Sequence, residues 1–436
     1  MNTRKRMLRS GWWLGVIALL PACDLLDVEN PNNLVQTDLE NPAAANAIAN
    51  GALATTSRAV GYLTALSGTS SDEVTWIGSR DGWGQLNEGK FGDPRNEFTD
   101  AAFPFMGEAR WMADEAVNLI DGFAAENPSD ATLVEEQARA NLYSAMIYTF
   151  LGEAYDDFVF SNRQEAGTPL GEAGMATLFD DAVSRLTTAM ALTTDDDLST
   201  QALAMRIRAQ YARAVWNQLK PSVTPMTWVN DPGLVADATT LLDRVNDDWR
   251  FQLDYVQNPT TDDQNNFSVW LNNRSELQFG DLYIDTDPAE PSENLGTKLH
   301  DPIDDVPDPA LDQIITEFEA GGDWSSMTVM SAREALLILA EAALASGDQP
   351  GFTTWVNRVR ALYPDLSPYS GQIPAEDLLM HMRRTNLYLQ NRRLADMYRF
   401  DIQSDNWQPG TAAVTDPGTF FPIAQTEIDA NPNVTG

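Results

Sequence analysis

The sequence has few of the residues on which disulfide, metal and nucleic-acid chemistry depend. Cysteine occurs once in 436 residues, which excludes an internal disulfide. The two histidines, His300 and His381, are far apart in the chain and lack metal-ligand spacing, so we expect a surface or capping role for His381. Lys and Arg number 28 against 64 Asp and Glu, a formal net charge of -36. Nucleic-acid binding requires basic side chains that neutralise phosphates, so we expect no nucleic-acid partner.

Catalytic motifs are also absent from the sequence. Neither a glycine-rich phosphate loop nor a nucleophile-elbow serine occurs. A glycosidase needs two carboxyl groups about 5 to 9.5 Å apart. Carboxylates are so abundant in this sequence that such a pair is expected by chance, so a helical glycoside hydrolase stays open as a less favoured alternative. Residues 195–197 and 301–308 are acidic enough for calcium, but neither has EF-hand spacing, so a solvated surface is favoured. We therefore predict no catalytic residue, no metal ligand and no cofactor.

The first residues resemble an export signal with a lipid-attachment site. Basic residues precede a short apolar run, which is far below the roughly 20 apolar residues that span a bilayer. The run ends in a small residue followed by Cys23, the pattern of a bacterial lipobox. Acyl chains such as palmitate on Cys23 would anchor the chain, since each buried methylene contributes about 0.8 kcal/mol. We predict a signal peptide over 1–22 and a lipidated, acidic tether over 23–40; a free thiol after a simple signal is the alternative.

Most of the remaining chain has helical periodicity. Thr132 with Glu135, and Ser331 with Glu334, are possible capping boxes, and Gly347 is placed to end a helix. Apolar stripes recur at helical spacing, and successive helices are close enough in sequence to pair. The fold class predicted is mainly α, with tetratricopeptide-like helix pairs and few short strands, although the thirty-four-residue signature of that repeat is absent. The stripes are 142–150, 179–190, 203–214 and 336–344, and a partner helix is expected over 352–362.

Three stretches lack this periodicity. Residues 220–330 are rich in Pro, Asn, Asp and Thr, with a weakly alternating, strand-like run at 276–283. Residues 68–96 are similar, and the tail over 404–436 is irregular, with 420–423 expected to pack back on the helices. Long irregular stretches in a compact protein are more often binding surface than filler. We therefore predict a single helical domain over 41–436 in which 220–330 forms an irregular insert on the ligand side.

The predicted ligand-binding residues are aromatic and polar side chains within these irregular stretches. Aromatic platforms with a few hydrogen-bonding groups suit an extended sugar. Burial of these rings in the core is the alternative for each of them. The first segment offers Asp72, Trp76, Arg80 and Trp83, and the opposing side is expected from Trp270, Tyr283 and Trp324.

Short motifs occur along the chain at 23–32, 140–156, 276–279, 334–342, 356–360, 383–399 and 421–432. In their residues and in their order they resemble those of the SusD/RagB family of outer-membrane nutrient-binding lipoproteins. The chain departs from the family pattern at Met382, Asn386 and Gln390, where acids are usual, and at Asn391, where glycine is usual. We expect the missing acids to affect local packing more than function.

The resemblance implies a binding function without catalysis. Family members sit outside the outer membrane as a lid on a TonB-dependent, SusC-like transporter and capture oligosaccharides or peptides for import. By resemblance we expect this chain to do the same, held at the outer membrane by lipid on Cys23. A helical repeat scaffold that binds only protein partners is the main alternative, and the tryptophan-bearing insert is the feature that such a scaffold does not need.

Overall fold

The computed structural model describes residues 40–162, 165–257, 264–287 and 290–435. The predicted signal peptide over 1–22, Cys23 and the tether up to residue 39 lie outside the described residues. Within the described part of the chain, no helix combines the length and the apolar character needed to cross a membrane.

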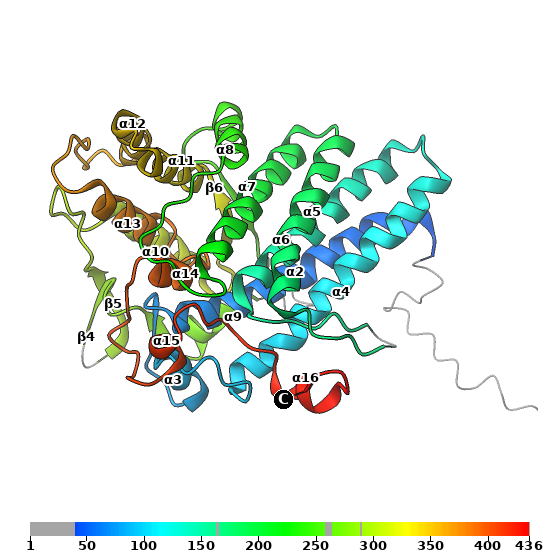
Figure 1. The fold of residues 1–436 in the computed structure, drawn as a ribbon, viewed down its shortest axis with the longest axis horizontal. Helices are drawn as coiled ribbons and strands as arrows, with labels where there is room; N and C mark the ends of the chain where they lie inside the picture. Colours follow the sequence, from blue (N-terminus) through cyan, green and yellow to red (C-terminus); the bar gives the residue numbers. More distant parts are fainter. Residues whose placement is uncertain (1–39, 163–164, 258–263, 288–289, 436) are drawn as a thin grey trace, which may run out of the picture.

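Long helices form one half of the molecule, and consecutive helices pack against each other (Figure 1). The neighbouring pairs are α4 with α5, α5 with α6, α6 with α7, α7 with α8, α8 with α11, and α11 with α12, while α2 packs on α4 and α5. The prediction of a mainly helical fold built from tetratricopeptide-like pairs is therefore confirmed. The helices are α2 (Ala45–Ser70), α4 (Glu97–Glu126), α5 (Ala131–Ala154), α6 (Gly171–Leu192), α7 (Asp196–Leu219), α8 (Pro232–Arg244), α11 (Ala332–Ser346) and α12 (Gln349–Arg360).

The helix ends follow local side-chain chemistry. Ser331 Oγ accepts a hydrogen bond from Glu334 N at 3.1 Å, and Gly347 ends α11 with a φ of +73°, both as predicted. The predicted cap at Thr132 is wrong, because Asp130 lies two residues earlier and its carboxylate accepts from Thr132 N and Leu133 N. A carboxylate at a helix N-terminus also interacts favourably with the helix dipole.

Short elements form the other half, where α3, α9, β4, β5 and the C-terminal helices lie below the long helices in Figure 1. Three two-stranded antiparallel sheets pair β1 (Val74–Trp76) with β3 (Leu277–Phe279), β2 (Arg250–Leu253) with β6 (Met327–Ser331), and β4 (Ile284–Asp287) with β5 (Glu290–Thr297). The prediction of few, short strands is confirmed. The short helices are η1 (Pro42–Ala44), α3 (Asp81–Asn87), α9 (Asn266–Ser268), η2 (Val269–Asn273), α10 (Pro309–Gly321), η3 (Gly322–Trp324), α13 (Ala375–Asn386), α14 (Arg393–Arg399), α15 (Ala412–Thr415) and α16 (Gln425–Ala430).

The 220–330 region is more regular than its composition indicated. It contains the helices α8 and α10 and every strand except β1 and the end of β6. Asp231 and Asp308 cap the two helices, and a proline follows each cap at the first helical position, where its missing N–H carries no penalty. Proline and aspartate, which suggested loops in the sequence, here mark helix starts.

The two halves share one core, to which the C-terminal segment is tied by buried ion pairs. Arg399 and Glu341 are both fully buried and paired, and Arg399 also contacts Asp396 at 3.1 Å. Arg383 binds the same Asp396 at 2.8 Å, and Tyr211 of α7 donates to Glu341 at 2.6 Å. A buried charge is tolerated only when it is paired, so these contacts fix α13 and α14 against α7 and α11.

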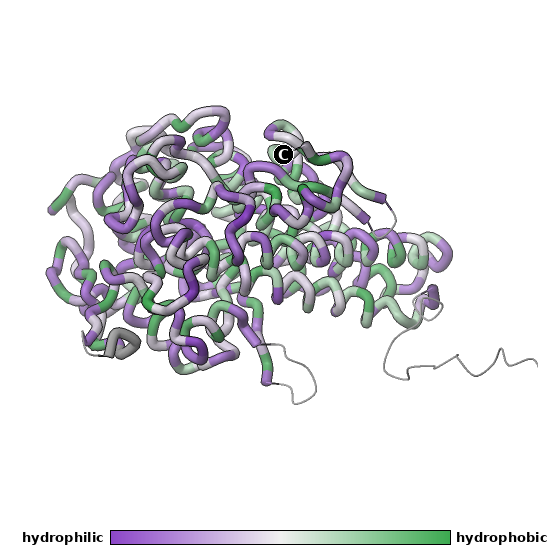
Figure 2. The backbone as a smooth tube through the Cα atoms, turned by 90° about the horizontal axis from the view of Figure 1, so that it is seen from below, coloured by the Kyte–Doolittle hydropathy of each residue, from purple (hydrophilic) through white to green (hydrophobic). Residues whose placement is uncertain are grey.

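The tail packs back on the helices as expected. Phe421 N donates to Ala154 O at 3.0 Å, and Asp156 N donates to Phe421 O at 3.0 Å. Phe420 and Phe421 are buried. Along the helical rods, hydrophilic and hydrophobic residues alternate (Figure 2), which is the pattern of helices with one buried face.

Candidate functional site

The two irregular segments that carry the predicted ligand residues meet in a small sheet. In the β1–β3 pair Trp76 lies opposite Leu277. The Glu276 carboxylate, just before β3, accepts hydrogen bonds from Ser79 N at 2.8 Å and Arg80 N at 2.9 Å, and Ser79 Oγ donates to it at 3.0 Å. Burial alone would raise the pKa of Glu276, but these hydrogen bonds outweigh burial and lower the pKa. An ionised carboxylate thus fixes the loop after Trp76.

An aromatic cluster underlies this loop. Trp83 is 1% exposed and stacks on Phe98, with ring centroids 3.9 Å apart. Trp270 meets both rings edge-on, at 5.4 Å from Trp83 and 5.2 Å from Phe98. Trp270 itself is half-buried, and its indole N–H donates to Asn266 Oδ1 at 3.0 Å. Trp83 therefore belongs to the core, and the prediction that it contacts a ligand is wrong. Its ring supports Trp270, which reaches the surface.

Trp76 and Arg80 lie on the accessible side of α3. Trp76 is half-buried, and its ring covers Gly84 so closely that a Cβ there would come within 3.0 Å of it. Trp270 covers Trp83 of the same helix. Arg80 is exposed and pairs with Glu97 at 3.0 Å, a contact that solvent weakens. We call the group of Trp76, Arg80 and Trp270 the aromatic surface.

The prediction that Asp72 and Tyr283 contact a ligand is also wrong, because both side chains are buried in protein contacts. Arg393 binds both oxygens of Asp72 at 2.7 Å, and Tyr283 Oη donates to the same carboxylate at 2.7 Å. Burial raises the pKa of Asp72, but Arg393 outweighs it and the net pKa is lowered. Arg384 lies 4.4 Å from the Tyr283 ring centroid, and Tyr283 is fully buried. Both residues hold the C-terminal segment in place and are inaccessible to a ligand.

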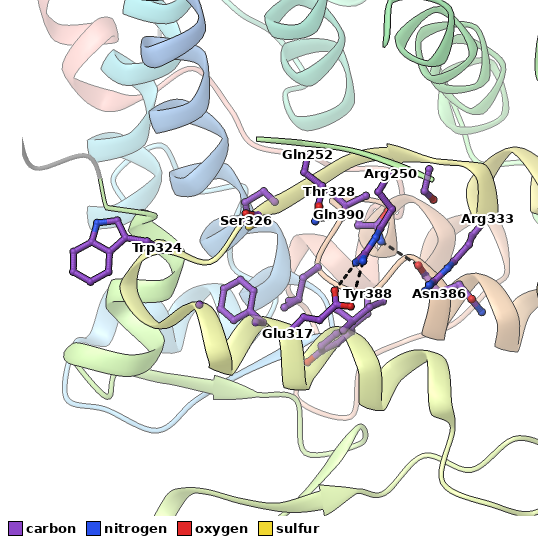
Figure 3. A pocket seen from close by; sticks show the side chains of 16 residues that line it. Arg250, Gln252, Glu317, Trp324, Ser326, Thr328, Arg333, Asn386, Tyr388 and Gln390 are labelled. Atoms are coloured by element: carbon purple, nitrogen blue, oxygen red, sulfur yellow. Dashed lines mark hydrogen bonds and ion pairs between the residues drawn. The ribbon is translucent and has the colours of Figure 1, made fainter. Parts of the chain in front are cut away.

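Trp324 lies beside the aromatic surface and also lines a pocket. It belongs to η3, which is tied to η2 by a hydrogen bond from Asn272 Nδ2 to Gly322 O at 3.0 Å. Trp324 is half-buried and lines one end of a pocket of about 240 Å³ between β2, β6, α10 and the segment 386–390 (Figure 3). No sequence pattern indicated this pocket, although two of its lining residues, Asn386 and Gln390, are departures from the family pattern.

A larger groove of about 670 Å³ runs along α2 and the residues after β2. Among the described residues that line it, none has a buried polar side-chain atom without a partner. It therefore offers fewer specific contacts than the pocket at Trp324.

Within the described ranges, one group of three residues has the types and spacing of metal ligands. Side-chain atoms of Asp301, Asp308 and His381 lie within 4.8 Å of one another. Arg360 contacts Asp301 at 2.6 and 3.1 Å, and His381 Nε2 lies 2.7 Å from Asp308 Oδ2. The solvated surface expected for 301–308 is thus wrong at Asp301 and Asp308, which are buried and engaged by protein groups. His381 supports the residue that caps α10.

The fold and the aromatic surface define a class of protein: stacked helix pairs that carry a loop-rich face with tryptophans fixed by ionic and aromatic contacts. Comparison with known proteins is consistent with this class. Residues 319–436 match the model of the SusD family. No curated protein matches the sequence.

Solved structures resemble the chain over almost its whole length. A SusD homolog from Bacteroides thetaiotaomicron has a TM-score of 0.66 at 14% identity and covers 92% of this chain and 98% of its own. A SusD superfamily protein from Parabacteroides distasonis has a TM-score of 0.63 at 13% identity, covering 92% and 99%. A SusD-like carbohydrate binding protein from Bacteroides vulgatus has a TM-score of 0.57 at 12% identity, covering 90% and 97%.

The C-terminal region of the chain matches the model of the SusD family, and the described chain shares its fold with solved SusD superfamily proteins. The resemblance found in the motifs is thereby confirmed.

Proposed function

We propose that this chain is a cell-surface lipoprotein that captures oligosaccharides and delivers them to a TonB-dependent, SusC-like transporter of the outer membrane. Lipid on Cys23 is the proposed anchor, and no covalent step on the ligand is required. The observation that carries the proposal is the aromatic surface. Trp76 of β1 and Trp270 of η2 are half-buried, and each packs against a residue of the short helix α3, so each ring has a fixed orientation and an accessible part.

The physical argument rests on rigidity. A sugar ring presents C–H groups on its faces and hydroxyls on its edge, and it suits an aromatic face beside hydrogen-bonding groups. Arg80, four residues after Trp76 in the chain, is exposed and carries donors, and the Glu276 carboxylate holds the backbone of residues 79 and 80. Because the packed Trp76 and Trp270 rings are ordered before binding, little of their conformational entropy is lost when a ligand binds. The likeness to a protein described as SusD-like and carbohydrate binding supports the same ligand class.

The test is retention of the soluble protein, beginning at Asp24, on insoluble polysaccharides and on immobilised peptide pools. We expect retention on at least one polysaccharide, weakened about 3- to 10-fold in affinity by Trp76→Ala or Trp270→Ala, because one aromatic contact is worth roughly 0.5–1.5 kcal/mol. Trp355→Ala is the matched control, since Trp355 is also half-buried but lies on α12 beside Arg358.

Retention on peptides alone would show that the captured ligand is a peptide and not an oligosaccharide. Retention on neither class would favour a scaffold that binds only proteins. Equal binding by the Trp76, Trp270 and Trp355 variants would refute the aromatic surface as the ligand site.

A further inference from the structure

The pocket beside Trp324 has an open rim and a buried polar floor. Its rim includes Ser326 and Glu317, which are exposed, and the half-buried Trp324. Asn386 and Gln390 form part of its floor and are 4% and 6% exposed. A single water needs roughly 10–15 Å³ of such space, so about 240 Å³ admits a ligand much larger than one water. In Figure 3, Trp324 lies at one end of the pocket, and Arg333 and Asn386 lie at the other.

Three buried polar atoms at this inner end have no hydrogen-bond partner. They are Asn386 Oδ1, Gln390 Oε1 and Arg333 Nε. The amide orientations are fixed, because Asn386 Nδ2 donates to Met382 O and Gln390 Nε2 donates to Asn386 O, both at 3.0 Å. Buried polar groups in folded proteins nearly always have partners, so these three unpaired atoms are available to hydrogen-bond a molecule in the pocket.

The unpaired atoms specify the chemistry of that ligand. Two of them are acceptors that need a donor, and one is a donor that needs an acceptor. An anion only accepts and an ammonium group only donates, whereas a hydroxyl does both. The cations in the lining are already neutralised, since Arg250 pairs with Glu317 and Arg333 pairs with Asp248. The pocket therefore fits a neutral ligand with several hydroxyls, and the Trp324 ring offers an apolar face at the outer end.

The backbone at the floor is held in an unusual conformation. Leu389 and Asn391, on either side of Gln390, have φ values of +59° and +63°. A buried leucine in the left-handed region is uncommon, and such residues cluster at binding sites. Leu389 N donates to Glu73 Oε1 at 3.0 Å, and Tyr388 Oη donates to Glu73 O at 2.6 Å. The segment before β1 thus maintains the conformation that brings Gln390 into the pocket lining.

We propose that this pocket is a second carbohydrate site, which binds one neutral, hydroxyl-rich sugar unit apart from the aromatic surface. That the ligand is a sugar rests on the proposed function, but the location of the site and the neutrality of its ligand rest on the pocket alone. Amides at 386 and 390, where the family pattern has acids, give the pocket two neutral acceptors. Carboxylates at these positions would place negative charge on the buried floor of the pocket instead.

The experiment titrates the soluble protein with glucose, galactose, mannose, glucuronic acid and glucosamine, observed by ligand-detected NMR and calorimetry. We expect at least one neutral hexose to bind in the millimolar range and the acidic and cationic sugars to bind at least 10-fold more weakly. Gln390→Glu and Asn386→Asp should each weaken the neutral hexose at least 10-fold. Gln349→Glu, an exposed change at the start of α12, is the matched control and should bind as the unaltered protein does.

A second change keeps the test decisive if the floor variants fail to fold. Ser326→Trp fills the exposed rim and leaves the floor unaltered, so it should abolish hexose binding while the circular dichroism and the melting temperature stay unchanged. No hexose binding by the unaltered protein, or equal binding by the Gln390, Asn386 and Ser326 variants, would overturn the proposal.

Different results would refute the proposed function and the pocket site. If Trp76→Ala abolishes polysaccharide retention while Gln390→Glu and Ser326→Trp leave every binding constant unaltered, the aromatic surface stands and the pocket site is refuted. If no polysaccharide is retained but a hexose binds and is lost in the pocket variants, the pocket site stands and the proposed function fails.

Discussion

Replacing Glu73 with glutamine should stabilise the protein at neutral and alkaline pH and have little effect in acid. Glu73 is 2% exposed, and burial raises the pKa of its carboxyl from the ordinary 4.5 to about 8. The acceptor for Leu389 N is retained in glutamine, so the change mainly removes the ionisable proton. The folded protein therefore binds one more proton at Glu73 than the unfolded chain between these two pKa values.

The sign and size of the change in the free energy of unfolding follow from proton linkage. A group whose pKa is raised by folding stabilises the fold fully below pH 4.5, and this contribution is lost as the pH rises toward 8. At pH 7.5 the loss spans three pH units from 4.5, at about 1.4 kcal/mol per unit. Glu73→Gln should thus gain on the order of 4 kcal/mol over the unaltered protein at pH 7.5 and almost nothing near pH 4.5.

The assay is urea unfolding of both proteins at half-unit steps from pH 4.5 to 8.5, with the difference in free energy of unfolding plotted against pH. Subtracting the two proteins cancels the titration of all other groups that the change does not affect. Glu126→Gln, an exposed change at the end of α4, should give a flat difference. A flat line for Glu73→Gln, or one that falls with pH, would refute the assignment of a protonated, buried carboxyl.

The remaining predictions concern the anchor and the core. Cys23→Ala should move the protein from the membrane to the soluble fraction of fractionated cells, and firm retention in the envelope would contradict a lipid anchor there. Arg399→Met should lower the free energy of unfolding by about 3–5 kcal/mol, because Glu341 would stay buried without its partner; a loss below 1 kcal/mol in urea unfolding would show that the pair matters little. Trp83→Ala should cost roughly 3–5 kcal/mol through the cavity left against Phe98, so a thermal melt that matched the unaltered protein would place the ring at the surface instead.

The helical half of the fold could be predicted from sequence because its signals are local. Apolar spacing set the buried faces, and Ser331 and Gly347 mark the ends of α11 where the pattern put them. The cap of α5 was misassigned between two neighbouring candidates, since Asp130 competes with Thr132 and only the backbone geometry decides between them. The 220–330 insert was misjudged in part, because proline and aspartate occur both in loops and at helix starts.

The candidate site could be predicted only in outline. The two segments that carry the predicted ligand residues meet at the β1–β3 pair, but composition does not reveal which of their side chains face inward. Trp83 and Trp76 are seven positions apart, and a stacking partner at Phe98 makes one of them core. Asp72 is buried because Arg393, more than three hundred residues later, binds it. The pocket was missed for the same reason, since its walls come from four separate parts of the chain.

The hydrogen bonds between Ser79 and Glu276 have a consequence for biogenesis. The two residues are 197 positions apart, and Tyr388 is 315 positions from the Glu73 carbonyl that it contacts. Contacts of such separation form late in folding, because a long loop must close before any of them is made. If the chain is exported N-terminus first, as proposed, the aromatic surface cannot form before Glu276 has emerged, and the pocket cannot form before Gln390 has emerged. Neither proposed site is therefore available while the first half of the chain emerges.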